Sequence, residues 1–213
     1  MFRVIYEDEN IIAVDKPPGV AVIPERKPDG SDIITELRRV RGPSVYAVHR
    51  LDKPVSGVLL VAKNRLFHRY LNKLFEERKV HKHYIAVVHG RVDQKRGTIS
   101  APIRRFGSGR MGVDFNRGKR SVTHFKVLAY GRECTMMALF PTTGRPHQLR
   151  VHLYHIGHPV VGDKMYGERA TALIHDRTYL HCMRLKLPKP QGQDFYSFKS
   201  SVPPEFRAIL RYL

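Results

Sequence analysis

A single carboxylate lies among basic residues in a short segment of the chain, His49-Arg50-Leu51-Asp52-Lys53-Pro54-Val55-Ser56-Gly57. Apolar, strand-like stretches at 45–48 and 58–62 flank this segment, so we predict a surface loop on a rigid base. The neighbouring cations favour the ionised form of Asp52, which a nucleophile or general base requires and a general acid does not. The alternative is a structural carboxylate that pairs with Arg50 and caps a turn.

The second segment that could take part in the chemistry is an apolar stretch, Lys82-His83-Tyr84-Ile85-Ala86-Val87-Val88-His89-Gly90. Its composition predicts a strand, in which Tyr84, Ala86 and Val88 share one face. Tyr84 is therefore either an ordinary core residue with a satisfied hydroxyl or a flat platform for a flipped base.

The third segment, Gly144-Arg145-Pro146-His147-Gln148-Leu149-Arg150-Val151-His152-Leu153, is followed closely by His155 and His158. Pro146 suits the first position of a helix. His147, His152 and His155 do not share the i, i+4 face of a helical zinc site, and no Glu accompanies them, so we predict no metal site. The head group of Arg150 is placed to reach a carboxylate from another segment.

The charge of the whole chain indicates a polyanionic partner. Its 213 residues include 38 Lys plus Arg against 19 Asp plus Glu, a formal charge of +19, and the pI is near 10.3. Each cation that neutralises a phosphate releases a counterion, so nucleic acid is the expected partner. A basic surface kept for solubility and an anionic membrane surface are the weaker alternatives.

The composition also limits the class and location of the protein. With 42% hydrophobic and 27% charged residues the chain is globular, and no apolar run approaches the roughly 20 residues that cross a bilayer. The N-terminus lacks the features of a signal peptide, so we expect a cytoplasmic protein without a membrane partner. Cys134 and Cys182 are far apart in apolar stretches, which is typical of reduced, buried thiols.

Hydrophobic periodicity predicts one domain, residues 1–213, of the α+β class, with a central mixed, largely antiparallel sheet, flanking helices and basic loops. Helices are expected from a cap at Ser31 or Asp32 to Val40, from a cap at Asn64 to Arg78, from Pro146 to Ile156, and after Pro204. The predicted strands are 2–6, 11–14, 45–48, 58–62, 83–89, 121–129, 133–140, 179–187 and 195–199.

The stretch from Arg104 to Arg120 is rich in glycine and in cations, and Asp114 is its single acid. We predict a loop there that binds the phosphates of a nucleic acid. The cations assigned to this role are Arg104, Arg105, Arg110, Lys119 and Arg120, and a second basic cluster lies at Arg38, Arg39 and Arg41.

Taken together, the three segments resemble the signatures of the RluA-type pseudouridine synthases, in the same order and at similar spacing. The resemblance extends from about residue 2 to about residue 204. The loop departs from the family at Val55, where Thr is usual, and the helix at Pro146, where Thr or Ser is usual. The first predicted strand begins at residue 2, so we expect no S4-like RNA-binding domain before it.

The resemblance implies the pseudouridine synthase catalytic fold and the isomerisation of selected uridines in tRNA or rRNA to pseudouridine, without cofactor or metal. By motif position, Asp52 is the catalytic aspartate, Tyr84 stacks on the target base and accepts the C5 proton, and Arg150 pairs with Asp52. Arg50 is expected to fill the space that the flipped nucleotide leaves. Attack of Asp52 on C1′, attack on C6, and abstraction of a ribose proton all remain open.

Two other functions remain as alternatives. A non-catalytic RNA-binding protein of the same fold is the first, although such a relative would be expected to have lost Asp52, Tyr84 or Arg150. A metal-dependent nuclease is the second, and it would need carboxylates clustered near Asp52, which the sequence lacks. No protein partner is implied, so we expect a monomer.

Overall fold

The backbone divides into two units, and the chain passes from one to the other at residues 81/82, 181/182 and 201/202. The structure is a computed structural model that describes residues 2–25, 32–107, 109–167, 175–190 and 194–213. The first unit holds residues 1–81 and 182–201, and the second holds 82–181 and 202–213.

A strand buried along its whole length organises the first unit. This strand, β4 (Ser56–Ala62), lies between β2 (Ile11–Lys16) and β11 (Leu180–Pro188), and every residue of β4 is buried. The outer strands are β1 (Arg3–Glu7) beside β2, β3 (Tyr46–Ala47) beside β4, and β12 (Phe195–Lys199) beside β11. Such a continuous apolar run is typical of a central strand.

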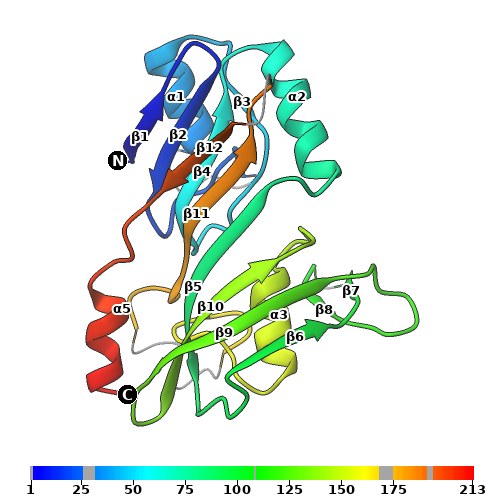
Figure 1. Cartoon of the computed structure of the whole chain (residues 1–213), viewed down its shortest axis with the longest axis vertical. Coiled ribbons are helices and arrows are strands. Elements are labelled where there is room, and N and C mark those ends of the chain that lie inside the picture. Colours follow the sequence, from blue (N-terminus) through cyan, green and yellow to red (C-terminus); the bar gives the residue numbers. More distant parts are fainter. Residues whose placement is uncertain (1, 26–31, 108, 168–174, 191–193) are drawn as a thin grey trace. The chain divides into compact units, whose positions relative to one another are not determined.

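The two helices of the first unit begin at the caps that the sequence predicts. Asp32 accepts hydrogen bonds from the backbone nitrogen (2.9 Å) and hydroxyl (2.7 Å) of Thr35 at the start of α1 (Ile33–Arg41). Asn64 accepts one from Phe67 N (2.8 Å) at the start of α2 (Arg65–Glu76). Ser31, the other candidate cap, lies outside the described residues. In Figure 1, α1 is behind the β1–β2 hairpin.

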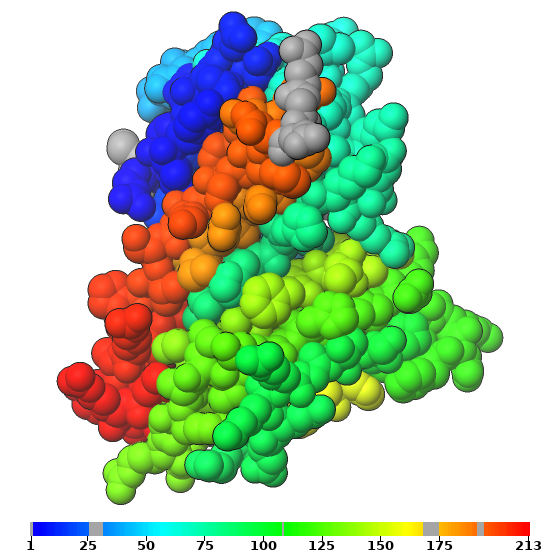
Figure 2. All heavy atoms as spheres, viewed as in Figure 1, coloured from blue at the N-terminus to red at the C-terminus, as the bar shows by residue number. Residues whose placement is uncertain are grey.

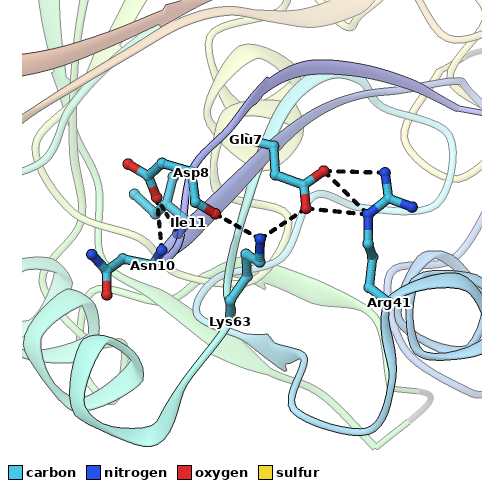
Figure 3. A network of polar contacts seen from close by, with 6 residues as sticks. All are labelled: Glu7, Asp8, Asn10, Ile11, Arg41 and Lys63. Carbon is cyan, nitrogen blue, oxygen red and sulfur yellow. Dashed lines mark hydrogen bonds and ion pairs between the residues drawn. The ribbon is translucent and has the colours of Figure 1, made fainter.

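A polar network fastens the turn between β1 and β2 (Figure 3). The Oδ1 atom of Asp8 accepts hydrogen bonds from the backbone nitrogens of Asn10 and Ile11, both at 2.8 Å. Glu7 binds Arg41 (3.1 Å) and Lys63 (2.9 Å) at once, which joins the hairpin to the end of α1 and to the segment after β4. These contacts hold the pKa of Glu7 below its usual value.

Four strands in the order β5-β10-β9-β6 form the sheet of the second unit, and each neighbouring pair is antiparallel. Their bounds are β5 (His81–His89), β6 (Arg96–Ser100), β9 (Val122–Tyr130) and β10 (Cys134–Pro141). Helix α5 (Glu205–Ala208) and a 3₁₀ turn (Ile209–Arg211) follow Pro204. The α+β class is confirmed, and β6, with Ile99 as its one buried residue, was not expected.

The stretch predicted as a loop between Arg104 and Arg120 contains a β-hairpin instead. Strands β7 (Ile103–Arg105) and β8 (Met111–Val113) pair antiparallel, and β8 lies against helix α3 (Gln148–His155). Met111 and Val113 pack on a buried cluster of Ile103, Val151 and Tyr166. The glycines and arginines suggest a loop, but this apolar contact makes the segment a hairpin. We call residues 103–113 the basic hairpin.

Helix α3 begins two residues later than the sequence predicts, so the placement of Pro146 at its first position is wrong. Pro146 lies in a turn, and His147 has a left-handed backbone (φ 54°) before Gln148 starts the helix. The side-chain oxygen of Gln148 accepts hydrogen bonds from Thr143 Oγ1 (2.7 Å) and Arg145 N (3.0 Å), and its side-chain nitrogen donates to Val122 O (3.0 Å). These bonds tie the preceding turn to β9 and fix where the helix begins.

Among the described residues, no helix has the length and apolar character needed to cross a membrane. Cys134 and Cys182 are buried and neither belongs to a disulfide, as the sequence predicts.

Candidate active site

Asp52 lies in a turn of the first unit, just before β4. The neighbouring Leu51 and Val55 are buried, whereas Asp52 is half-buried and Arg50 is exposed. The carbonyl oxygen of Asp52 accepts a hydrogen bond from Val55 N (3.0 Å), which closes the turn. The buried side chains of Leu51 and Val55 anchor the loop, and Asp52 between them stays partly exposed, in agreement with the predicted surface loop.

A buried lysine that sequence reasoning missed holds this turn in place. The Nζ atom of Lys16 donates to the backbone carbonyls of Pro17 (2.8 Å), Val20 (2.7 Å) and Lys53 (3.1 Å). A buried ammonium needs such acceptors, because its desolvation is otherwise very costly. The only sequence signal for this role is that alternation along β2 places Lys16 on the same face as Val14.

His49 is a second anchor of the loop. Its Nε2 atom accepts a hydrogen bond from Leu60 N of β4 at 2.9 Å, so the ring proton is on Nδ1. The ring also stacks on Phe75 of α2, with centroids 4.8 Å apart. The loop is therefore tied to a central strand and to a helix, which fixes the chain on the N-terminal side of Asp52.

Gly57 allows the chain that leaves the loop to approach β11. Its φ is 110°, a conformation that side chains rarely adopt, and a Cβ there would lie 2.7 Å from the backbone nitrogen of Cys182. A larger residue would force the start of β4 away from β11.

Tyr84 lies near the start of β5 in the second unit, opposite Leu139 of β10. Residues 84–88 are all buried, and Tyr84 is 9% exposed. The predicted strand is confirmed, and it holds the ring in a packed environment. Its predicted role as a stacking platform stays a prediction.

Arg150 is buried in α3 and makes a two-pronged ion pair with Asp163, a pairing that the sequence did not predict. Nε lies 2.7 Å from Oδ2 and Nη2 lies 2.8 Å from Oδ1, with the side chains 4% and 0% exposed. Such a pair fixes the plane of the guanidinium group. The pairing of Arg150 with Asp52 stays a prediction.

Asp163 is held by further donors. The backbone nitrogens of Met165 (2.9 Å) and Tyr166 (3.2 Å) also donate to Oδ1. Burial raises the pKa of Asp163, but Arg150 and these two amides outweigh burial and keep the pKa below its usual value. Asp163 therefore remains the charged partner of Arg150 at neutral pH.

Tyr166 connects this ion pair to the basic hairpin. Its buried ring lies 5.0 Å from the guanidinium carbon of Arg150, and its hydroxyl bonds to His147 Nδ1 (2.7 Å) and Met111 N (3.1 Å). The contact with Tyr166 gives a structural role to His147, whose left-handed backbone precedes α3. The sequence offered no signal for Tyr166, because its partners are distant along the chain.

The histidines of the third segment have structural partners. His152 is buried, with Nδ1 3.0 Å from Thr123 Oγ1 and Nε2 2.9 Å from Ala101 O, and burial lowers its pKa. His158 bonds to the carbonyl oxygen of His89 (2.9 Å). Across the described ranges, no group of three His, Cys, Asp or Glu side chains is placed to hold a metal ion.

The basic hairpin and the chain up to β9 carry the cations assigned to RNA. Figures 1 and 2 show this stretch in green at the right-hand edge of the second unit. Arg104 is paired with Asp114 at 2.9 Å and is half-buried. The other assigned cations, Arg105, Arg110, Lys119 and Arg120, are exposed.

Comparison with known proteins identifies the family. Residues 10–155, which include Asp52, Tyr84 and Arg150, match the model of the RNA pseudouridylate synthases. The chain belongs to this family. The synthase is therefore an isomerase that converts uridine in RNA to pseudouridine, as the resemblance of its motifs implied.

Individual relatives match over most of the synthase. It is 37% identical over 197 residues to the dual-specificity RNA pseudouridine synthase RluA of Vibrio vulnificus, covering 89% of the chain and 79% of the relative. It is 36% identical over 214 residues to the uncharacterized RNA pseudouridine synthase YjbO of Bacillus subtilis, covering 98% and 75%. The solved structure of human RNA pseudouridylate synthase domain containing 1 has a TM-score of 0.82 at 30% identity and covers 98% of the synthase and 87% of that chain.

Proposed function

We propose that the synthase modifies uridines of structured RNA, tRNA or rRNA, and that Asp52 initiates the reaction. The observation that carries this proposal is the anchored turn, in which buried Lys16 and the ring of His49 fix the chain on both sides of the half-buried Asp52. A fixed position is what a nucleophile or base needs, because misplacement by about 1 Å costs about 10²-fold in rate.

Pseudouridine mapping tests this function directly. Total RNA from cells with and without the synthase is treated with a reagent that marks pseudouridine and then read by primer extension. At least one mark in tRNA or rRNA is expected to disappear without the synthase and to return with the wild-type gene. Identical maps from both strains would contradict the proposal.

In the proposed reaction, the bond between N1 and C1′ breaks, the uracil turns, and C1′ bonds to C5. The proton on C5 is then removed, and N1 gains a proton. Asp52 starts this sequence, and Tyr84 accepts the C5 proton after stacking on the base. Arg150 pairs with Asp52, and Asp163 positions Arg150 by fixing its guanidinium plane.

Replacing Tyr84 by Phe is expected to slow turnover and leave RNA affinity close to that of the wild type. The ring that stacks on the base is kept, whereas the hydroxyl that accepts the proton is lost, and proton transfer typically contributes about 10²–10⁴-fold. Single-turnover release of tritium from RNA labelled at uridine C5 measures the step. Tyr130→Phe, on β9, is the control, and an unchanged rate for Tyr84→Phe would reduce Tyr84 to a platform.

The basic hairpin is proposed to bind phosphates, with Arg50 filling the space of the flipped nucleotide and Lys119 and Arg120 adding contacts. The triple variant Arg104→Ala/Arg105→Ala/Arg110→Ala is expected to flatten the plot of log K against log salt. Each lost contact removes about 0.7–0.9 from the slope, and the pairing of Arg104 with Asp114 favours a total loss of about two.

Filter binding between 50 and 300 mM salt measures this slope. Removal of three exposed cations from α2, with Arg65→Ala/Arg69→Ala/Lys73→Ala, is the control and is expected to change it less. An unaltered slope in the hairpin variant would place the phosphate contacts elsewhere, for example around Arg38, Arg39 and Arg41.

The remaining parts of the proposal concern the working form of the synthase. Both units are proposed to act as one catalytic domain, residues 1–213, because Asp52 belongs to the first and Tyr84 and Arg150 to the second. A cytoplasmic monomer suits the basic composition and the two buried cysteines, which form no disulfide.

A further inference from the structure

A cavity of about 370 Å³ lies between the basic hairpin and helix α3, entirely within the second unit. Its walls include Phe106 and Arg110 from the hairpin, and Tyr154 and His155 from α3, with Tyr166 among its lining residues. A cavity of this size falls in the range of small-molecule sites, about 300–1,000 Å³. We call it the hairpin pocket.

The lining of the hairpin pocket combines aromatic faces with a cation. The guanidinium carbon of Arg110 lies 5.0 Å from the ring centre of Tyr166 and 5.7 Å from that of Tyr154. Tyr154 is 52% exposed, so much of its side chain is accessible to a ligand. Aromatic planes beside arginine are the combination on which unpaired bases stack.

The pocket is built on a rigid frame. Tyr166 is buried, and its hydroxyl is fixed by His147 Nδ1 (2.7 Å) and Met111 N (3.1 Å). Val113 and Met111 pack on the same buried cluster, which holds the hairpin against α3. A preformed site loses little conformational entropy when a ligand binds.

The charge around the pocket selects a polyanionic ligand. The chain from 103 to 120 carries six Lys or Arg residues and one acid, Asp114, which is already paired with Arg104. A base that enters the pocket brings its own phosphates beside these cations. An acidic peptide would neutralise these cations, but it has few planar groups that could stack on the aromatic side chains of the pocket.

We infer that the hairpin pocket binds a second, unpaired nucleobase of the RNA substrate, distinct from the uridine that is isomerised. The base stacks on Tyr154, while Arg110 and the neighbouring cations hold its phosphates. The inference rests on the proposed function, because the RNA must already be the substrate. It gives the synthase a means of selecting RNAs that carry an unpaired nucleotide in addition to the target uridine.

Binding of two synthetic RNAs tests the inference. Both have the same stem, one with a loop of seven uridines and the other with a loop of seven abasic nucleotides. Tyr154→Ala is expected to weaken binding of the uridine loop about 5- to 150-fold and to leave binding of the abasic loop nearly unchanged. The salt slope should not change, because no charge is removed. Tyr154→Phe and Tyr212→Ala, an 81% exposed tyrosine elsewhere, should bind both RNAs like the wild type.

Equal effects of Tyr154→Ala on the two RNAs, or no effect on either, would overturn the inference. Cross-linking of the wild-type protein to a loop containing 5-iodouridine provides a test that needs no variant. The cross-linked peptides are expected to include Phe106 or Tyr154, and cross-links that miss both residues would also overturn it. Tritium release from cellular RNA separates the two proposals, since it tests the isomerisation and does not depend on the pocket.

Discussion

Asp52→Asn is expected to abolish tritium release from RNA labelled at uridine C5, with RNA affinity within a few-fold of the wild type. The amide has nearly the shape of the carboxylate but lacks its charge and basicity. Loss of a general base typically costs about 10²–10⁴-fold, and loss of a nucleophile costs as much or more. The anchors of the turn, Lys16 and His49, contact the backbone and β4, so the substitution leaves the loop in place.

The measurement is single-turnover tritium release at saturating RNA, with affinity determined separately by filter binding. Asp93→Asn, which changes an exposed carboxylate of the second unit, is the matched control and should keep full activity. Activity of Asp52→Asn within a few-fold of the wild type would remove Asp52 from the mechanism. Loss of RNA binding together with activity would instead make Asp52 a structural carboxylate of the loop.

The sequence predicted those elements whose determinants are local. Asp32 and Asn64 cap helices because a short polar side chain reaches the nitrogen three residues ahead. The apolar run of β4 needs no distant information either. The predicted start of α3 was wrong because the helix begins at Gln148, whose side chain bonds to the distant Val122 O of β9. The basic hairpin was missed because its contact with Tyr166 is made across 55 residues.

The candidate site shows the same division. Asp52, Tyr84 and Arg150 were predicted as site residues because each belongs to a contiguous motif. The role of Lys16 was missed because its acceptor on Lys53 lies 37 residues away. The pairing of Asp163 with Arg150 was missed because nothing local marks these two residues as partners. A contiguous motif therefore supplies the groups that we propose to meet the substrate, whereas the residues that position them become visible only in the folded chain.

Asp163→Asn is expected to produce the largest loss of stability. It leaves the guanidinium of Arg150 buried beside a neutral amide, and breaking a buried ion pair in this way typically costs about 3–5 kcal/mol. For a chain of this length the melting temperature should fall by about 6–20 °C. Asp194→Asn, which removes an 81% exposed carboxylate from a 3.7 Å pair with Lys189, should change the free energy of unfolding by about 1 kcal/mol or less.

The pH dependence separates the charge of Asp163 from its shape. Because the pKa of Asp163 is lower in the folded protein than its unfolded value of about 3.9, its stabilising effect is fully present above that value and is lost as the pH falls below it. Urea unfolding should therefore give free energies of unfolding for the wild type and Asp163→Asn that are far apart at pH 7 and converge below about pH 4.

The double variant Arg150→Met/Asp163→Leu, which removes both charges, should be more stable than Asp163→Asn. Parallel curves, or a double variant no more stable than the single one, would mean that Asp163 acts through packing rather than as the counter-charge of Arg150.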